Sequence, residues 1–102
     1  MKAEVHWSAQ VQNFLNSLSP EPRRKLRLAI RRLAGDHGDI RPLADELTAY
    51  SRLRVGHYRL IYREAFEKGV AVRKCLFAER RDVVCEIFRQ MVLDDIRQTG
   101  SI

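Results

Sequence analysis

The fold is decided by residues 50–63, which have the sequence YSRLRVGHYRLIYR. Apolar and polar residues alternate on both sides of Gly56-His57, and the branched and aromatic residues that favour strands are frequent. A β-hairpin is therefore predicted, with its turn at Gly56-His57. Because successive side chains of a strand point to opposite faces, the apolar residues of this stretch should face a hydrophobic core.

The polar face of this hairpin is expected to consist of arginines. They are Arg52, Arg54, Arg59 and Arg63. Arg80 and Arg81 should lie at the end of a neighbouring strand. Like charges on paired strands repel one another, so such a cluster costs stability unless acids or an anionic ligand compensate it. Two interpretations stay open: an anion-binding site, and a solvated outer face with the counter-charges Glu64, Glu79 and Asp82.

Two amphipathic helices are predicted before the hairpin. Ser8 is a suitable N-cap, and apolar residues then recur at helical spacing as far as Leu18. A second helix is predicted over residues 23–34, with Gly35 as its C-cap. Two consecutive helices with a short joint form an αα-hairpin.

The remaining segments complete an α+β fold. Residues 4–7 are predicted to form a first strand and residues 70–77 a last one, followed by a helix from about Val84 to Leu93. Residues 40–48 are expected to form an ordered connection with little regular structure. The order β-α-α-β-β-β-α describes a small antiparallel sheet covered mainly on one face by the helical hairpin.

Length and composition favour one domain spanning residues 1–102, because a second core could not bury enough apolar area. The net charge is +6, and 15 of the 19 basic residues are arginine, which binds phosphate in a bidentate manner and stacks on bases. Nucleic acid is therefore the first partner to consider. The alternative explanation of this excess of arginine over lysine is a general preference for arginine in the source proteome.

The chain is expected to be cytoplasmic, because its N-terminus does not resemble a signal peptide and no apolar run could span a bilayer. No membrane contact is predicted. Cys75 and Cys85 lack CxxC spacing, so they are interpreted as core residues. His37 lies beside two aspartates but is interpreted as part of a solvated turn, so neither a metal nor a cofactor is predicted.

The run from Leu53 to Arg63, LRVGHYRLIYR, resembles the central signature of the RelE/ParE toxin superfamily. Residues 77–84, FAERRDVV, resemble the arginine-bearing segment that precedes the last helix of this family. The resemblance extends from about Glu4 to Leu93 and implies a RelE-like fold, which agrees with the predicted elements.

The resemblance implies that the chain is the toxin of a type II toxin–antitoxin pair. RelE-like members cut mRNA in the ribosomal A site without a metal, whereas ParE-like members inhibit DNA gyrase. Both kinds are held inactive by a cognate antitoxin, here expected to be an acidic protein. The first hypothesis is accordingly a ribosome-dependent mRNA endonuclease. A gyrase inhibitor and a degenerate toxin that only binds its antitoxin are the alternatives.

By this resemblance, Arg59 would bind the scissile phosphate, because it matches the arginine of the family's Tyr-Arg pair. Arg54 matches a basic residue on the preceding strand, and Arg52 stands where the nucleases often have a lysine. Arg81, or its neighbour Arg80, matches the arginine that binds the phosphate or the leaving group. Catalytic roles are thus expected for Arg52, Arg54, Arg59 and Arg81, and RNA-binding roles for Arg63 and Arg80.

Two departures from the family pattern bear on catalysis. Cys85 occupies the place where many active nucleases carry a tyrosine, and Tyr50 or Ser51 falls where a second lysine would be expected. Arginine hardly ever deprotonates, so a site of arginines alone stabilises charge but offers no general base. His57, in the predicted turn, is the only nearby group that titrates near neutrality and is carried as a hypothetical base. Its alternative role is that of a polar turn residue.

Overall fold

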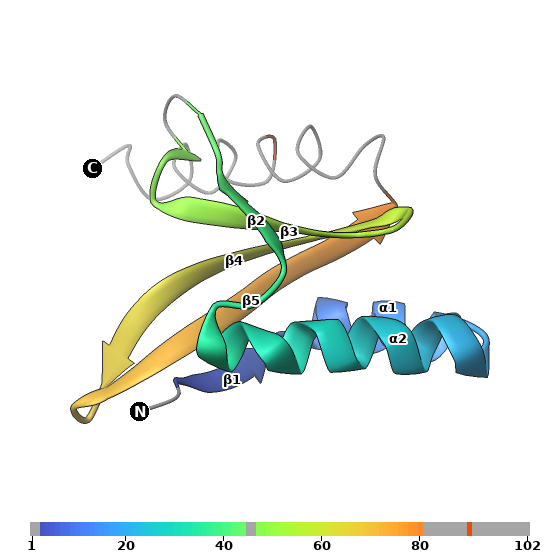
Figure 1. The fold of residues 1–102 in the computed structure, drawn as a ribbon, viewed down its shortest axis with the longest axis horizontal. Coiled ribbons are helices and arrows are strands. Elements are labelled where there is room, and N and C mark those ends of the chain that lie inside the picture. The colour runs from blue at the N-terminus through green and yellow to red at the C-terminus, as the bar shows by residue number, and fades with distance from the viewer. Residues whose placement is uncertain (1–2, 45–46, 81–89, 91–102) are drawn as a thin grey trace.

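The computed structural model describes residues 3–44, 47–80 and 90. Two helices pack on one side of a five-stranded sheet (Figure 1). In chain order the elements are β1 (Glu4–Trp7), α1 (Ala9–Ser17), α2 (Pro20–Arg31), the 3-10 turn η1 (Arg32–Gly35), β2 (Asp39–Pro42), β3 (Tyr50–Val55), β4 (Tyr58–Glu67) and β5 (Val70–Arg80). The α+β class and the helical hairpin agree with the sequence prediction.

Helix α1 begins where the sequence predicts. The Ser8 hydroxyl accepts a hydrogen bond from the Val11 backbone N–H at 3.2 Å, which satisfies one of the free donors of the first turn. Val11 and Leu15 then face the core. Helix α1 therefore buries one stripe against the sheet, as its apolar spacing requires.

Arg23 holds the joint between α1 and α2 together. Its guanidinium donates to the carbonyl oxygens of Leu15 at 3.0 Å and Leu18 at 2.8 Å, which are among the last acceptors of α1. Leu26 and Ile30 of α2 are buried in the same core as α1. One of the many arginines of this helix is thus committed to structure.

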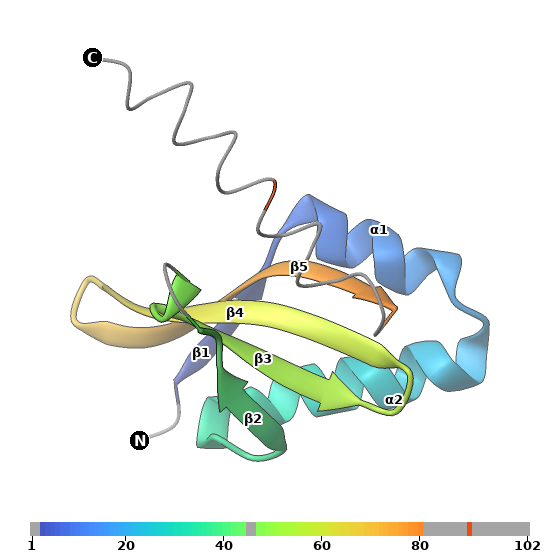
Figure 2. The same ribbon diagram turned by 90° about the horizontal axis from the view of Figure 1, so that it is seen from above.

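The sheet has the order β1-β5-β4-β3-β2, so β1 and β2 are its edge strands. Figure 2 shows β5, β4 and β3 side by side. The β2-β3, β3-β4 and β4-β5 pairs are antiparallel, as predicted. The β1-β5 pair is parallel, which corrects the expectation of a purely antiparallel sheet. The helical hairpin allows this pairing, because it carries the chain away from β1 before the other strands form.

Strand β2 (Asp39–Pro42) overlaps the start of residues 40–48, where a connection with little regular structure was expected. It pairs with β3 through Ile40 and Leu53 and through Arg41 and Arg52. The strand was not predicted because only one of its residues, Ile40, is one of the apolar strand-favouring types, and because Pro42 cannot donate a hydrogen bond to a ladder. Its edge position tolerates both features.

The two faces of the sheet bury two separate apolar clusters. The larger cluster joins the helices to the sheet and includes Leu53, Leu60, Tyr62, Cys75 and Ala78 from the strands. The smaller cluster, on the opposite face, consists of Leu47, Ile61 and Phe77 with partly buried neighbours. These faces are called the helix-covered face and the outer face below.

A register shift in the β4-β5 ladder explains how the two clusters divide β5. Ile61 pairs with Phe77 and Tyr62 pairs with Cys75, so β5 contains one extra residue, Leu76. Strict alternation would place Cys75 and Phe77 on the same face. The shift instead buries Cys75 under the helices and Phe77 on the outer face.

The predicted C-terminal helix, from about Val84 to Leu93, lies almost entirely outside the described residues. Within residues 3–44, 47–80 and 90, no helix has the length and apolar character needed to cross a membrane.

Candidate nucleic-acid interface

The structure places the four predicted arginines of the hairpin on the outer face. Arg54 pairs with Arg59 across the β3-β4 ladder, so these two neighbours share a face. Arg52 pairs with Ile61, and Arg63 pairs with Tyr50. Ile61 and Tyr50 both pack in the outer cluster. The cations therefore surround a small apolar patch, which the sequence prediction did not anticipate.

Strand β2 brings an acid to these cations. Asp39 pairs with Arg54 in the register, and its carboxylate lies 3.8 Å from Arg52 and 3.9 Å from Arg54. One carboxylate is thus shared by two guanidinium groups at distances too long for strong hydrogen bonds. Among the described residues, the buried Nε atoms of both Arg52 and Arg73, which lie on opposite faces of the sheet, have no hydrogen-bond partner. What distinguishes Arg52 and Arg54 is that, within the described part of the chain, they share one carboxylate between them.

Arg59 differs from its neighbours because it is only 8% exposed. Its Nη1 donates to the backbone carbonyl oxygens of Gly56 and Tyr58, each at 2.9 Å. These bonds tie the guanidinium to the β3-β4 turn. Arg59 therefore has a structural role in holding the turn, alongside the phosphate-binding role that the sequence predicts.

His57 occupies the turn itself and is exposed. It lines a cavity of about 340 Å³ between the turn and α2, together with Lys25 and Tyr58 among others. This cavity lies on the helix side of the hairpin, whereas Arg54 points to the outer face. His57 thus lies close to Arg54 in the chain but faces the helix side of the hairpin, not the outer face.

Arg80 ends β5, as predicted, but its register partner is Tyr58 of the helix-covered face. Its guanidinium lies over the Tyr58 ring, 5.9 Å from the centroid. Arg80 is therefore not brought together with the four arginines of the outer face. Arg81 and Cys85 lie outside the described residues.

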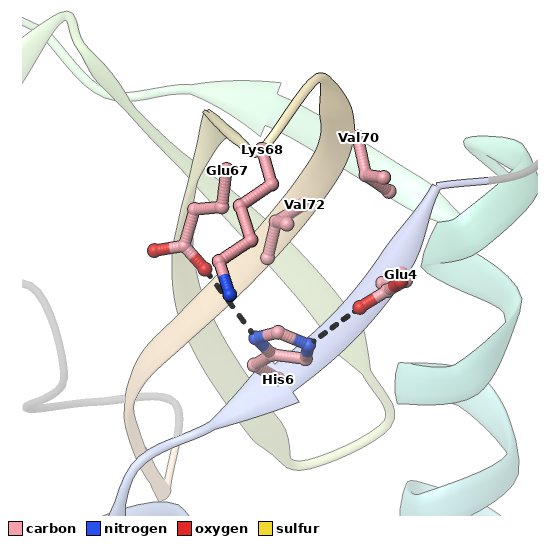
Figure 3. Close-up of a pocket in the computed structure, with 6 residues that line it drawn as sticks. All are labelled: Glu4, His6, Glu67, Lys68, Val70 and Val72. Carbon is pink, nitrogen blue, oxygen red and sulfur yellow. Dashed lines mark hydrogen bonds and ion pairs between the residues drawn. The ribbon is translucent and has the colours of Figure 1, made fainter.

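The outer face continues past Arg63 to a mixed group of charges at the β1 edge (Figure 3). His6 of β1 lies between Glu4, with Nε2 to Oε1 at 2.9 Å, and Glu67, with Nδ1 to Oε1 at 3.9 Å. Lys74, which pairs with both His6 and Arg63, contacts Glu67 at 2.6 Å. A hydrogen bond from Lys74 lowers the pKa of Glu67, which therefore stays ionised at neutral pH.

Sequence reasoning missed this group because its members come from β1 and from the β4-β5 hairpin, far apart in the chain. A cavity of about 530 Å³ adjoins it, lined by Glu4, His6, Glu67, Lys68, Val70 and Val72. The alternation in residues 4–7 was the available signal, since it places Glu4 and His6 on one face of β1. Counting only residues 3–44, 47–80 and 90, the outer face has matched charges at this end, whereas at the other end Arg52 and Arg54 share one acid.

The arrangement at Arg52 and Arg54 can bind and stabilise an anion. Fixed guanidinium groups suit a phosphate, because their planar fork matches two of its oxygens. They supply no general base, since arginine keeps its proton. Any proton transfer must therefore involve another group or the substrate itself.

Comparison with solved structures finds the same fold. A chain of the RelBE2 toxin–antitoxin complex from Mycobacterium tuberculosis superposes with a TM-score of 0.66 at 22% identity, covering 79% of this chain and 93% of that one. The YoeB/ParE toxin from Agrobacterium tumefaciens gives a TM-score of 0.62 at 15% identity, covering 76% of this chain and 98% of that one.

Sequence comparison adds nothing further: no protein-family model matches the chain, and no curated protein matches it. The structural likeness nevertheless confirms, for the fold, the resemblance seen around the central hairpin. The chain therefore has the fold of toxins of the RelE and ParE kind.

Proposed function

We propose that this chain is the toxin of a type II toxin–antitoxin pair and that it cleaves mRNA on the ribosome without a metal. The fold that it shares with two toxin structures supports the toxin role. The hairpin of residues 50–63, which forms the centre of the sheet, supports the choice of the nuclease branch because it carries the arginines.

The observation that carries the proposal is the uneven charge of the outer face. Arg52 and Arg54 share the single carboxylate of Asp39, at 3.8 and 3.9 Å. Arg73, on the helix-covered face, has two carboxylates to itself, with contacts of 2.8 Å to Asp36 and 3.7 Å to Glu64. Around Arg73 there are thus two acids for one cation, whereas Arg52 and Arg54 are two cations with one acid between them. An anionic ligand supplies the missing compensation at Arg52 and Arg54.

The proposed chemistry is attack of a ribose 2'-hydroxyl on the adjacent phosphate. Negative charge builds up on the phosphate oxygens in the transition state, and cations held in place stabilise it without reorganisation. Arg54, which is about half exposed, is placed to contact the phosphate directly. Arg52 is more buried and would support it from β3, while Arg59 holds the turn that fixes both strands.

Growth arrest on induction in a bacterial host, together with primer-extension mapping of ribosome-bound mRNA, tests this proposal. Arg54→Ala should relieve the arrest and reduce cleavage by about a hundredfold or more, the range found on removing one transition-state charge donor. Arg24→Ala is the matched control, because Arg24 is exposed on α2 and pairs with Glu21 at 3.0 Å. Undiminished cleavage by a folded Arg54→Ala protein would contradict the assignment.

A gyrase-inhibiting role is the second candidate. Cys85 stands where many active nucleases carry a tyrosine, and inhibition by contact would not need that residue. A supercoiling assay with purified gyrase separates the two functions. Inhibition of gyrase without cleavage of mRNA would favour the second candidate. A chain inactive in both assays would be a degenerate toxin that only binds its antitoxin.

The proposed partner is an acidic antitoxin protein. The net charge of +6 favours it, as does the fact that the RelBE2 structure is a toxin–antitoxin complex. A gene for a small acidic protein should adjoin the gene for this chain. Co-expression of its product should abolish growth arrest, and a failure to do so would count against the pair.

A further inference from the structure

The β3-β4 turn separates two surfaces that both carry positive charge. On the outer face lies Arg54, whose side chain is 53% exposed. On the helix side lies the cavity of about 340 Å³ that Val55 and His57 help to line. Val55 directly follows Arg54 in β3, so the cavity and the exposed cation are one residue apart along the strand.

The cavity has apolar walls and two basic groups. Pro22 and Leu26 of α2 form one wall, and Val55 and Tyr58 form the other. The exposed side chains that line it are Lys25, from α2, and His57, from the turn. A ligand that fits must therefore combine a flat or compact apolar part with a negative charge.

The Tyr58 ring is held in a fixed orientation by two contacts. The Phe14 and Tyr58 rings form a T-shaped pair, with 5.7 Å between centroids and an interplanar angle of 75°. The Arg80 guanidinium lies 5.9 Å from its centroid. A preset aromatic surface is what an unstacked nucleobase needs, because the protein has already lost the ring's rotational freedom.

The turn is uncrowded at Gly56. Gly56 has φ +57°, and a Cβ placed on it would meet nothing within 4 Å. Apart from the chain neighbours of Gly56, no described residue therefore crowds the surface at this point between the outer face and the cavity. The volume is also suitable, since cavities that bind small ligands begin at about 300 Å³.

We propose that this cavity holds one unstacked base of a single-stranded RNA whose backbone contacts Arg54 on the other side of the turn. The base lies against Tyr58, and its phosphate is bound by Lys25 and His57. This inference rests on the proposed RNA function and adds to it a subsite for a nucleotide next to the cleavage site. An apolar side chain of an acidic protein would also fit, but the adjoining, partly compensated Arg52 and Arg54 favour a continuous polyanion.

Binding of short RNAs to the whole protein tests the proposal. Fluorescence anisotropy at fixed salt should compare a labelled RNA hexamer with a set of hexamers that lack one base each, at successive positions. Loss of the base at one position should weaken binding on the order of tenfold, as expected for one stacked base. Loss at the other positions should matter less.

The double variant Lys25→Glu/His57→Ala should bind the intact hexamer and that one abasic hexamer equally weakly. Both residues are exposed, so the fold should tolerate the changes. Lys68→Glu is the matched control, because it makes the same charge reversal at the exposed β4-β5 turn and should preserve the preference for the intact hexamer.

Two outcomes would overturn the inference while leaving the proposed function in place. In the first, the unmodified protein binds RNA but does not distinguish any abasic hexamer from the intact one. In the second, the double variant loses affinity for an acidic protein partner but not for RNA, which would make the cavity a protein-binding site. If the unmodified protein bound no RNA, the proposed function would fail and the inference with it.

Discussion

The helix-covered face and the outer face of the sheet use the same residue type in opposite ways. On the helix-covered face, Arg73 has contacts of 2.8 Å with Asp36 and 3.7 Å with Glu64. On the outer face, Arg52 and Arg54 share Asp39 at longer distances. A cation neutralised within the protein serves the fold, and one left in excess is available to a ligand. The difference therefore separates the arginine that is paired within the fold from the arginines that we propose to bind RNA.

The largest expected effect concerns Cys75 and tests how tightly the helix-covered face is sealed. Burial raises the pKa of the Cys75 thiol to about 12 from its ordinary value of 9.0. In a Cys85→Ser variant, alkylation of Cys75 by iodoacetamide at pH 8 should be at least roughly a hundredfold slower in the native protein than in urea, because the thiolate reacts. Rapid labelling of the native protein would show that this face opens readily.

The same thiol gives a pH dependence with a definite sign. Between about pH 9 and 12 the folded protein keeps a proton on Cys75 that the unfolded chain has lost. The free energy of unfolding should therefore decrease as pH rises through this window. Cys75→Ala should reduce that decrease, which urea titrations at pH 8 and pH 10 would measure.

The next effect compares the two apolar clusters. Leu60 of the larger cluster and Ile61 of the outer one are both fully buried. Leu60→Ala should lower the free energy of unfolding by about 3–5 kcal/mol. Ile61→Ala should lower it by about 2 kcal/mol, because the residues of a smaller cluster collapse more readily into the cavity. Urea denaturation measures both. Equal losses of unfolding free energy would mean that the outer cluster contributes as much to stability per buried side chain as the larger cluster.

A smaller effect separates the arginines. Arg73→Met should destabilise the protein by about 1–3 kcal/mol, because it removes the charged hydrogen bond to Asp36 and the ion pair with Glu64, while both acids remain exposed enough to be hydrated. The matched change Arg54→Met on the outer face should alter stability by no more than about 0.5 kcal/mol. If the two variants were equally destabilised, the distinction between structural and functional arginines would be lost.

The smallest effect concerns the shared acid of the outer face. Asp39→Asn should strengthen RNA binding by on the order of fivefold or less, because it removes a negative charge about 4 Å from two cations in water. Stability should change by less than about 1 kcal/mol. Anisotropy titrations at two salt concentrations measure the gain, which should shrink at high salt. Weaker RNA binding by this variant would argue against an anion site at Arg52 and Arg54.

Much of the fold follows from local sequence pattern. The hairpin of residues 50–63 has the predicted turn, and helix α1 begins after Ser8 as predicted. Helix α2 was predicted over residues 23–34 but spans Pro20–Arg31, and a 3-10 turn follows it, so Asp36 rather than the predicted Gly35 is the left-handed cap. Strand β2 could not be predicted, because it has one apolar residue and a proline. The register shift at Leu76 was equally hidden, since nothing in the local pattern shows which residue a ladder leaves unpaired.

The candidate site was predictable in part. The common face of Arg52, Arg54, Arg59 and Arg63 follows from a period of two and needed no tertiary information. The different orientation of Arg80 was not predictable, because it depends on the register shift within β5. The hydrogen bond by which Arg59 stabilises the turn could not be predicted either, since only the folded hairpin brings its guanidinium to the Gly56 carbonyl.

By itself, the sequence determined that arginines would gather on one side of a central hairpin, because alternation is a property of each strand alone. Only the tertiary structure decided which arginines of the sheet have acids of their own among the described residues and which share one. That outcome depends on Asp39 arriving on β2 beside Arg54 and on Asp36 reaching Arg73 from the end of η1. Pairing between distant segments is set by how the whole chain packs, so no local pattern encodes it.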